Sequence, residues 1–121
     1  MKPKINGTEF GSITIEKKIH DYDVVIHLDG EVEKRKKKLS KAVYGSSHVV
    51  SLDEAKHVYE EGAERIIVGA GQSSMLRLSD EAADYFDRKK CKVKLYSTPE
   101  AIEAWNKAEG KKLIGLFHVT C

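Results

Sequence analysis

The pattern of hydrophobic and polar positions divides the chain into two parts. In the first third, Phe10–Ile15 predicts one short strand and Tyr22–Leu28 a second, with polar residues between them. The run Val24–Ile26 lacks polar alternation, which indicates a strand covered on both faces. The dipeptide Asp29-Gly30 favours a type I′ hairpin, in which both central residues take positive φ, and Glu31–Glu33 begins the returning strand. This part of the chain predicts an antiparallel meander.

From residue 48 onward, short apolar runs alternate with helical patterns. His48–Val50 predicts a short strand. Ser51 and Glu54 form a capping box, in which each side chain is expected to bind the other's main-chain amide, and the helix that they begin is expected to end at Gly62. Arg65–Val68 is an apolar, β-branched run typical of the middle of a sheet. Residues 39–45, before this region, carry no clear pattern and are expected to form a connector.

Two further helices and two strands complete the chain. Ser79–Lys89 predicts a helix capped by its first residue, and Val93–Tyr96 predicts a strand. Thr98 and Pro99 match the N-cap and first position of a third helix, and Leu113–His118 predicts the last strand. This order predicts one α/β domain over residues 1–121, with helices packed on a mixed sheet.

Composition limits the classes of function that this chain could have. Hydrophobic residues make up 40% of the chain and charged residues 33%, which is typical of a globular domain. The net charge of +2 gives no bulk attraction to nucleic acid, and the apolar runs are too short to cross a membrane. Without a secretory signal, we expect a cytoplasmic protein. Abundant Lys and Glu with only three Asn or Gln residues favour a thermophilic source.

The best candidate binding site is the turn from Gly69 to Ser74, which follows a predicted buried strand. Gly69 and Gly71 would let the backbone approach an anion, and the amides of Gln72, Ser73 and Ser74 would receive its charge. A serine stands where a dinucleotide fingerprint has its third glycine, and the turn lacks the lysine of a Walker A loop. The alternative is a tight turn that needs glycine for positive φ.

Residues at the ends of two other strands extend this candidate site. In open α/β sheets, ligands collect at the carboxyl ends of parallel strands, which here includes Thr98 and His118. The N-cap position already explains Thr98. His118 and Thr120 share one face of the last strand, whereas Cys121 points to the other, and this argues against a catalytic Cys–His pair.

No metal or cofactor is expected. Cys91 and Cys121 lie thirty residues apart without a CxxC motif, and the histidines lack the spacing of a metal site. The basic run Lys34–Lys41 holds six cations, but no aromatic residue interrupts it for base stacking. We interpret it as the solvated edge of a hairpin rather than a nucleic-acid site.

Several segments recur in the same order in a known family: Phe10–Ile13, His20–Ile26, Asp29-Gly30, Gly45–Val49, Gly69–Gly71, Thr98–Ala101 with Asn106, and His118–Cys121. Over nearly its whole length the chain resembles the Mth-type uncharacterised domain family. Relatives include the human adipogenesis-associated Mth domain-containing protein and, more distantly, a mitochondrial complex I assembly factor. The resemblance implies a three-layer fold with a mixed central sheet, helices on it and a small N-terminal antiparallel sheet. It implies no reaction and brings no catalytic residues.

Two functions follow as hypotheses. The first is a non-enzymatic protein-interaction or assembly module with a protein partner, which agrees with the family resemblance and with the lack of a complete catalytic motif. The alternative is a small-molecule or anion-binding protein, or an enzyme, that uses Gly69–Ser74 with Thr98 nearby. The sequence assigns neither a reaction nor an oligomeric state.

Overall fold

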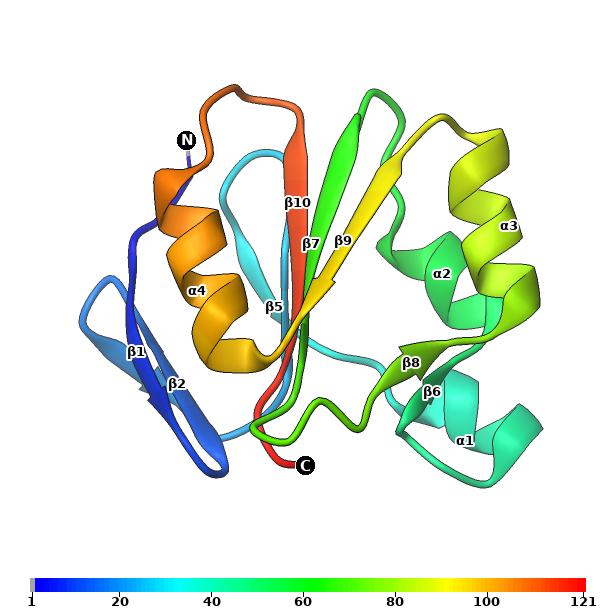
Figure 1. Ribbon diagram of the computed structural model, residues 1–121, viewed down its shortest axis with the longest axis horizontal. Helices are drawn as coiled ribbons and strands as arrows, with labels where there is room; N and C mark the ends of the chain where they lie inside the picture. The colour runs from blue at the N-terminus through cyan, green and yellow to red at the C-terminus, as the bar shows by residue number, and fades with distance from the viewer. Residues whose placement is uncertain (1) are drawn as a thin grey trace.

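The computed structural model describes residues 2–121 and contains a small antiparallel sheet at the N-terminal end of the chain (Figure 1). Its three strands, in order, are β1 (Ile5–Glu9), β2 (Ser12–Ile15) and β3 (Lys18–His20). The side chains of Ile5, Ile13 and Ile15 are buried on one face of this sheet. Phe10, which the pattern placed in a strand, instead lies in the turn between β1 and β2 and is 70% exposed.

A five-stranded mixed sheet forms the centre of the molecule. Its order is β5 (Val32–Lys34), β4 (Val24–Ile26), β10 (Leu113–His118), β7 (Arg65–Ala70) and β9 (Lys92–Tyr96). β4 is antiparallel to both β5 and β10, whereas β10, β7 and β9 are parallel. The predicted α/β class and mixed sheet are therefore confirmed.

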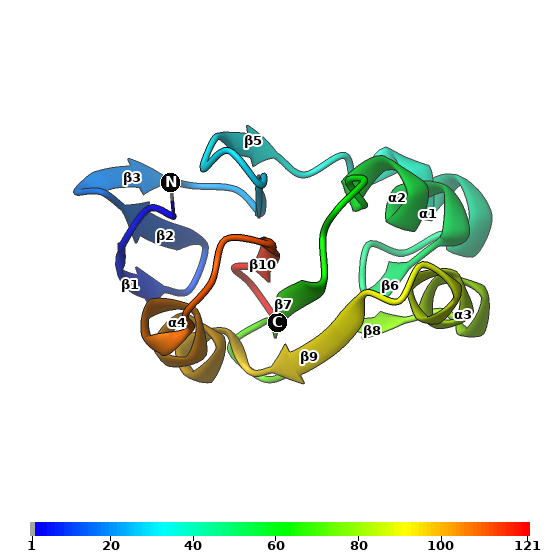
Figure 2. The same ribbon diagram turned by 90° about the horizontal axis from the view of Figure 1, so that it is seen from above.

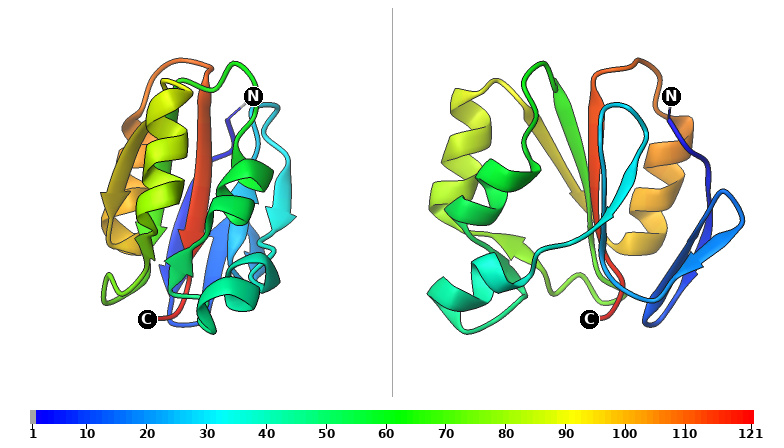
Figure 3. Two further views of the ribbon diagram at one scale, coloured as in Figure 1. Left: turned by 90° about the vertical axis from the view of Figure 1, so that its right-hand side faces the viewer. Right: turned by 180° about the vertical axis from the view of Figure 1, so that it is seen from behind.

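Both faces of the central sheet are covered by other elements (Figures 2 and 3). One face carries α2 (Leu52–Val58) and α3 (Asp80–Arg88), and the other carries α4 (Thr98–Lys107) together with the N-terminal sheet. A short helix, α1 (Lys38–Tyr44), and a two-stranded parallel sheet of β6 (Val49–Val50) and β8 (Arg77–Leu78) complete the fold. No described helix is long and apolar enough to cross a membrane.

The core has two halves because alternate residues of each central strand face opposite layers. In β4, Val25 packs toward α2 and α3, whereas Val24 and Ile26 pack toward α4 and the N-terminal sheet. The same alternation separates Ile66 from Ile67 in β7. Cover on both faces, predicted from the unbroken apolar runs, is confirmed.

Several local expectations were wrong. Only Gly30 takes positive φ in the β4–β5 turn, so the turn is not type I′. The Gly30 amide donates to the carbonyl of His27, and the His27 amide donates to Glu31, which closes a longer loop. The basic run does not stay at a hairpin edge, because residues 38–44 form α1. α2 ends at Val58, before Gly62, with Tyr59 as its C-cap.

Candidate functional site

The turn after β7 lies at the carboxyl edge of the central sheet, beside the start of α4 and the end of β10 (Figure 1). Gly71 has φ +105°, and a Cβ there would lie 2.2 Å from the carbonyl carbon of Cys121 and 2.8 Å from Cδ2 of His118. A Cβ at Gly69 would lie 2.9 Å from Oγ1 of Thr98. Both glycines are therefore required by close contacts inside the chain.

The amides of the turn bind the chain's own last residues. The Gln72 amide donates to the Thr120 carbonyl at 2.7 Å. The amides of Ser73 and Met75 both donate to the main-chain oxygen of Cys121, at 3.0 and 3.1 Å. The donors that the sequence assigned to an external anion thus hold main-chain oxygens of residues 120 and 121. Ser74, with φ +56°, donates its amide to Gly71 instead.

Thr98 is not the N-cap of α4, which contradicts the sequence prediction. Ser97 takes that position, and its hydroxyl is 3.0 Å from a carboxylate oxygen of Glu100. The buried hydroxyl of Thr98 accepts from the Gly71 amide at 2.9 Å and donates to the carbonyl of His118. Thr98 therefore ties the glycine turn to the end of β10.

The structure brings most of the predicted site residues together. Gly69, Gly71, Thr98 and His118 are in contact through the bonds and close approaches described above. The Gln72 side chain reaches the N-terminal sheet, where its amide donates to Thr8 Oγ1 at 3.1 Å. These contacts fasten residues 119–121 between two turns, because the Gly11 amide also donates to the Val119 carbonyl at 2.8 Å.

Next to this turn lies a group of buried charged residues that the sequence analysis missed. Asp23, directly before β4, accepts from His118 Nδ1 at 2.7 Å and from the Val119 amide at 2.8 Å. It also accepts from Arg35 Nη1 at 2.9 Å. The side chains of Asp23 and Arg35 are fully buried, and His118 is 1% exposed. A carboxylate so placed fixes the position of the histidine ring and of the last strand.

Arg35 connects this carboxylate to a second one. Its Nε and Nη2 bind both oxygens of Glu54, at 2.6 and 2.9 Å, and Nη2 also donates to the Ser47 carbonyl at 2.8 Å. Such a two-point contact is the strong form of the arginine–carboxylate pair. The Glu54 carboxylate therefore does not accept from the Ser51 amide, as it would in a capping box.

Two serines complete the buried network, which we define as Asp23, Arg35, Ser40, Ser51, Glu54 and His118. The Ser40 hydroxyl donates to Glu54 and accepts from the Ser51 amide at 2.9 Å. As predicted, the Ser51 hydroxyl accepts from the Glu54 amide, at 3.2 Å, and it also donates to the Leu39 carbonyl at 3.0 Å. Polar groups at this depth need such partners, because an unpaired one would cost about 1–3 kcal/mol.

Opposite charges within the network stabilise one another. Burial alone would raise the pKa of Asp23, but the hydrogen bonds from His118 and Val119, the charge of His118 and the bond from Arg35 lower it to about 2. Burial opposes the charge of Arg35, yet Glu54 and Asp23 raise its pKa. At the surface, the ammonium of Lys37 lies 3.8 Å from a carboxylate oxygen of Asp23 and adds a further positive charge beside this carboxylate.

The network contains an acid–base arrangement that is closed to solvent. Asp23 holds Nδ1 of His118, and Nε2 of the same ring lies 3.3 Å from the hydroxyl of Thr120. A carboxylate that orients a histidine toward a hydroxyl is the geometry of general base catalysis. The ring of His48 packs edge-on against His118 at 5.3 Å. Since His118 is 1% exposed, a substrate would reach it only after residues 119–121 moved.

Large apolar side chains are exposed at the end of the molecule that holds the buried network. Phe10, in the β1–β2 turn, is 70% exposed, and Met75, in the glycine turn, is 57% exposed. Both turns bind the segment 119–121, and both lie at the same end of the molecule as α1 (Figure 1). In α1, Val43 is 58% exposed. The carboxyl edge therefore combines a buried polar centre with exposed apolar side chains. We call Phe10, Met75 and Val43 the apolar rim.

The cysteines and histidines are placed as follows. Burial raises the pKa of the Cys91 thiol to about 11, whereas Cys121 lies half-buried at the carboxyl edge. Across residues 2–121, no group of three or more His, Cys, Asp or Glu side chains is arranged to hold a metal ion. His27 lies outside the carboxyl edge, between the carboxylates of Glu33 and Glu60 at 2.8 and 3.0 Å.

Comparison with known proteins identifies relatives that share this architecture. Residues 5–118 match a family model described as a protein of unknown function (DUF498/DUF598). The conserved hypothetical protein PH1505 from Pyrococcus horikoshii OT3 is 31% identical, with a TM-score of 0.91 over 98% of this chain and 99% of that chain. The solved structure of MT938 is 30% identical, with a TM-score of 0.83 over 99% of this chain and 100% of that chain.

More distant structures show the fold alone. A protein of Bordetella pertussis, described as a Mth938-like domain, is 14% identical and has a TM-score of 0.63 over 97% of this chain and 85% of that chain. The resemblance to Mth-type domains that the sequence suggested is confirmed. With a family model that spans residues 5–118 and two solved relatives at 30% identity or more, the chain belongs to the DUF498/DUF598 family of proteins of unknown function.

Proposed function

We propose that this domain is a non-enzymatic protein-interaction module that binds its partner at the carboxyl edge of the central sheet. The observation that carries the proposal is the pair of exposed apolar side chains, Phe10 and Met75, in two turns that both bind residues 119–121. Apolar side chains that gather on a surface stabilise association when a partner removes them from water. The partner chemistry that fits is a protein segment with exposed apolar side chains.

The polar centre beneath this rim supports a scaffolding role. Its carboxylates and guanidinium are satisfied inside the chain and fully buried, so they do not present charge to a ligand. Their contribution is to hold three segments, around residues 23, 35 and 118, in one fixed position under the rim. A rigid support of this kind lowers the entropic cost of binding, because the surface is ordered before the partner arrives.

The alternative is an anion or small-molecule site at Gly69–Ser74. It would require residues 120 and 121 to leave the turn, since their oxygens accept from the amides of Gln72, Ser73 and Met75. Inorganic phosphate is a direct probe of this alternative. If phosphate shifts the amide resonances of Gln72, Ser73 and Met75 in a saturable way, the anion site is favoured over the interaction surface.

A photo-crosslinking experiment tests the interaction surface. A photoreactive phenylalanine replaces Phe10 in one variant and the exposed Ile19 of β3 in a matched control, and both are expressed in the source organism. Ile19 is 69% exposed, almost as much as Phe10, but it belongs to the N-terminal sheet away from the glycine turn. We expect position 10 to link to one protein, and position 19 not to do so.

A second pair of variants tests whether the crosslink at position 10 depends on Met75. Met75→Ser in the position-10 background should reduce the yield of that crosslink severalfold. Val93→Ser, a change in β9 of the central sheet, serves as the control for general loss of stability. Equal labelling from positions 10 and 19, or a yield that Met75→Ser leaves unchanged, would contradict the proposal.

A cytoplasmic location in a thermophile is the setting that we infer for this module. The charged, amide-poor sequence supports it, and PH1505, one of its relatives, comes from Pyrococcus horikoshii. Nucleic acid is a poor candidate partner because Arg35 of the basic run is buried in ion pairs and Lys34 lies over the ring of Tyr22 at 5.3 Å.

A further inference from the structure

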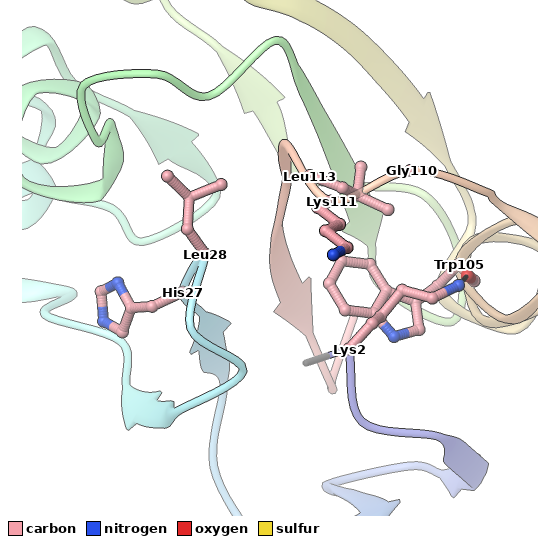
Figure 4. Close-up of a pocket in the computed structure, with 7 residues that line it drawn as sticks. All are labelled: Lys2, His27, Leu28, Trp105, Gly110, Lys111 and Leu113. Carbon is pink, nitrogen blue, oxygen red and sulfur yellow. Dashed lines mark hydrogen bonds between the residues drawn. The ribbon is translucent and has the colours of Figure 1, made fainter.

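A cavity of about 420 Å³ lies at the opposite end of the central sheet from the glycine turn. It opens where β4 and β10 diverge, since the pairing of these strands covers only Val24–Ile26 and Gly115–Phe117. Figure 4 shows His27 and Leu28 on one side of the cavity and, on the other, Lys2, Trp105, Gly110, Lys111 and Leu113. Its volume falls in the range of about 300–1,000 Å³ that is usual for small-molecule sites.

Three of the seven residues that line the cavity have large apolar side chains. Leu28 follows β4, Leu113 begins β10, and Trp105 comes from the buried side of α4. The indole N–H of Trp105 is already used, because it donates to the Pro3 carbonyl at 2.8 Å. Leu28 is half-buried, whereas Trp105 and Leu113 are 1% and 4% exposed and border the cavity only with their edges. Together they form a small apolar wall, which suits the apolar body of a small molecule.

Two lysines place positive charge at the cavity. Lys2 is held in position because its ammonium donates to the Trp105 carbonyl and, at 2.7 Å, to the Ala108 carbonyl at the end of α4. An ammonium has three N–H donors, so one remains for a further acceptor. Lys111 supplies the second cation, and the guanidinium of Arg65 lies behind Gly110, 3.3 Å from where a Cβ on that glycine would be.

The carboxylates on the other side of the cavity already have hydrogen-bond partners within the protein. His27 lies between Glu33 and Glu60, and both of its ring nitrogens contact carboxylate oxygens. Glu60 also accepts from the Leu28 amide at 2.8 Å. These carboxylates are occupied by groups of the protein itself. The positive charge that remains for a ligand thus comes from Lys2 and Lys111.

We propose that this cavity binds a small carboxylic acid with an apolar body. The carboxylate accepts from Lys111 and from the remaining donor of Lys2, and the body lies against Leu28 and the edges of Trp105 and Leu113. This site is distinct from the proposed interaction surface, because the two lie at opposite ends of β10.

Trp105 is the only tryptophan of the chain, so its fluorescence reports binding in this cavity directly. The probe is 3-phenylpropionate, and its uncharged amide serves as the matched ligand. We expect a saturable change in Trp105 emission with the carboxylate at millimolar concentration and binding at least about tenfold weaker for the amide, because charge-assisted hydrogen bonds are lost.

Variants assign the carboxylate contact. Lys111→Met should weaken 3-phenylpropionate binding by about tenfold and Lys111→Arg should restore most of it. Lys112→Met is the control, because Lys112 does not line the cavity and contacts Glu64 at 3.7 Å on the surface. Absence of a saturable fluorescence change, equal binding of acid and amide, or an equal effect of Lys111→Met and Lys112→Met would overturn the proposal.

Discussion

Replacement of Asp23 by Asn tests the buried network most directly. The substitution keeps the size of the side chain but removes the charge that faces Arg35 and His118. One amide oxygen can still accept from Val119, whereas the amide nitrogen would meet the N–H donors of Arg35 and His118. The variant therefore keeps the packing of this site and loses its electrostatics.

The expected destabilisation is large because the charges are out of water. Removal of one member of a fully buried ion pair costs about 3–5 kcal/mol, since the remaining charge stays buried without its partner. For a domain of this size that corresponds to a fall in Tm of roughly 10–20 °C. The exposed pair of Asp84 and Arg88 in α3, at 3.3 Å, gives the matched control. Asp84→Asn should cost no more than about 0.5 kcal/mol.

The pH dependence provides a second, independent readout. The folded-state pKa of Asp23 is lowered from 3.8 to about 2, which corresponds to about 2 kcal/mol of stability. Because the folded pKa is the lower one, this stability is present above pH 4 and is lost as the pH falls toward 2. In Asp23→Asn this part of the acid-induced loss should be absent.

Urea denaturation followed by circular dichroism, at neutral pH and at steps between pH 4 and 2, measures both quantities. The reasoning would be refuted if Asp23→Asn lowered the free energy of unfolding by less than about 1 kcal/mol at neutral pH. It would also be refuted if the variant and the parent lost stability in parallel between pH 4 and 2.

Two further predictions concern the glycine turn and the thiols. Gly71→Ala should cost about 2–4 kcal/mol in urea denaturation, because it adds backbone strain and a contact with Cys121, whereas Gly11→Ala, with φ +90° and open space, adds only strain of about 1–2 kcal/mol; equal costs would argue against the contact. Cys91, with a pKa raised to about 11 and 2% exposure, should react with a thiol reagent in the native state far more slowly than Cys121, and comparable rates for Cys91→Ser and Cys121→Ser would contradict this.

The sequence predicted elements well where the cause is local. Some elements depend on neighbours within a few residues, so their patterns indicate their structures. Examples are the apolar runs of β4 and β7 and the Ser79 cap of α3. Ser79 accepts from the Ala82 amide at 3.0 Å, as an N-cap should. The class of fold followed from the order of these elements.

Residues whose partners are distant in sequence were harder to interpret. Arg35 lies among lysines in the sequence. The two carboxylates that bind it are 12 and 19 positions away, so only the folded chain shows that Arg35 is buried. Glu54 had a local partner in the capping box, but the charge of Arg35 outcompetes the Ser51 amide. Thr98 matched an N-cap, yet its hydroxyl binds across to β10. The predicted turn began at Gly69, whereas Gly69 and Ala70 still belong to β7 and the turn begins at Gly71. The segment that fills this turn could not be predicted from the turn itself.

The position of β10 determines when the central sheet can form during synthesis. β10 pairs with both β4 and β7, and no other strand joins those two, although β10 follows every other described strand in the sequence. When only residues 1–112 have left the ribosome, β4 can pair with β5 and β7 with β9. No strand is yet present to join these two pairs by hydrogen bonds. At that stage the buried pair of Asp23 and Arg35 also lacks His118. Folding of this domain should consequently be delayed until residues 113–119 emerge, and then proceed through contacts of high sequence separation, which fold slowly.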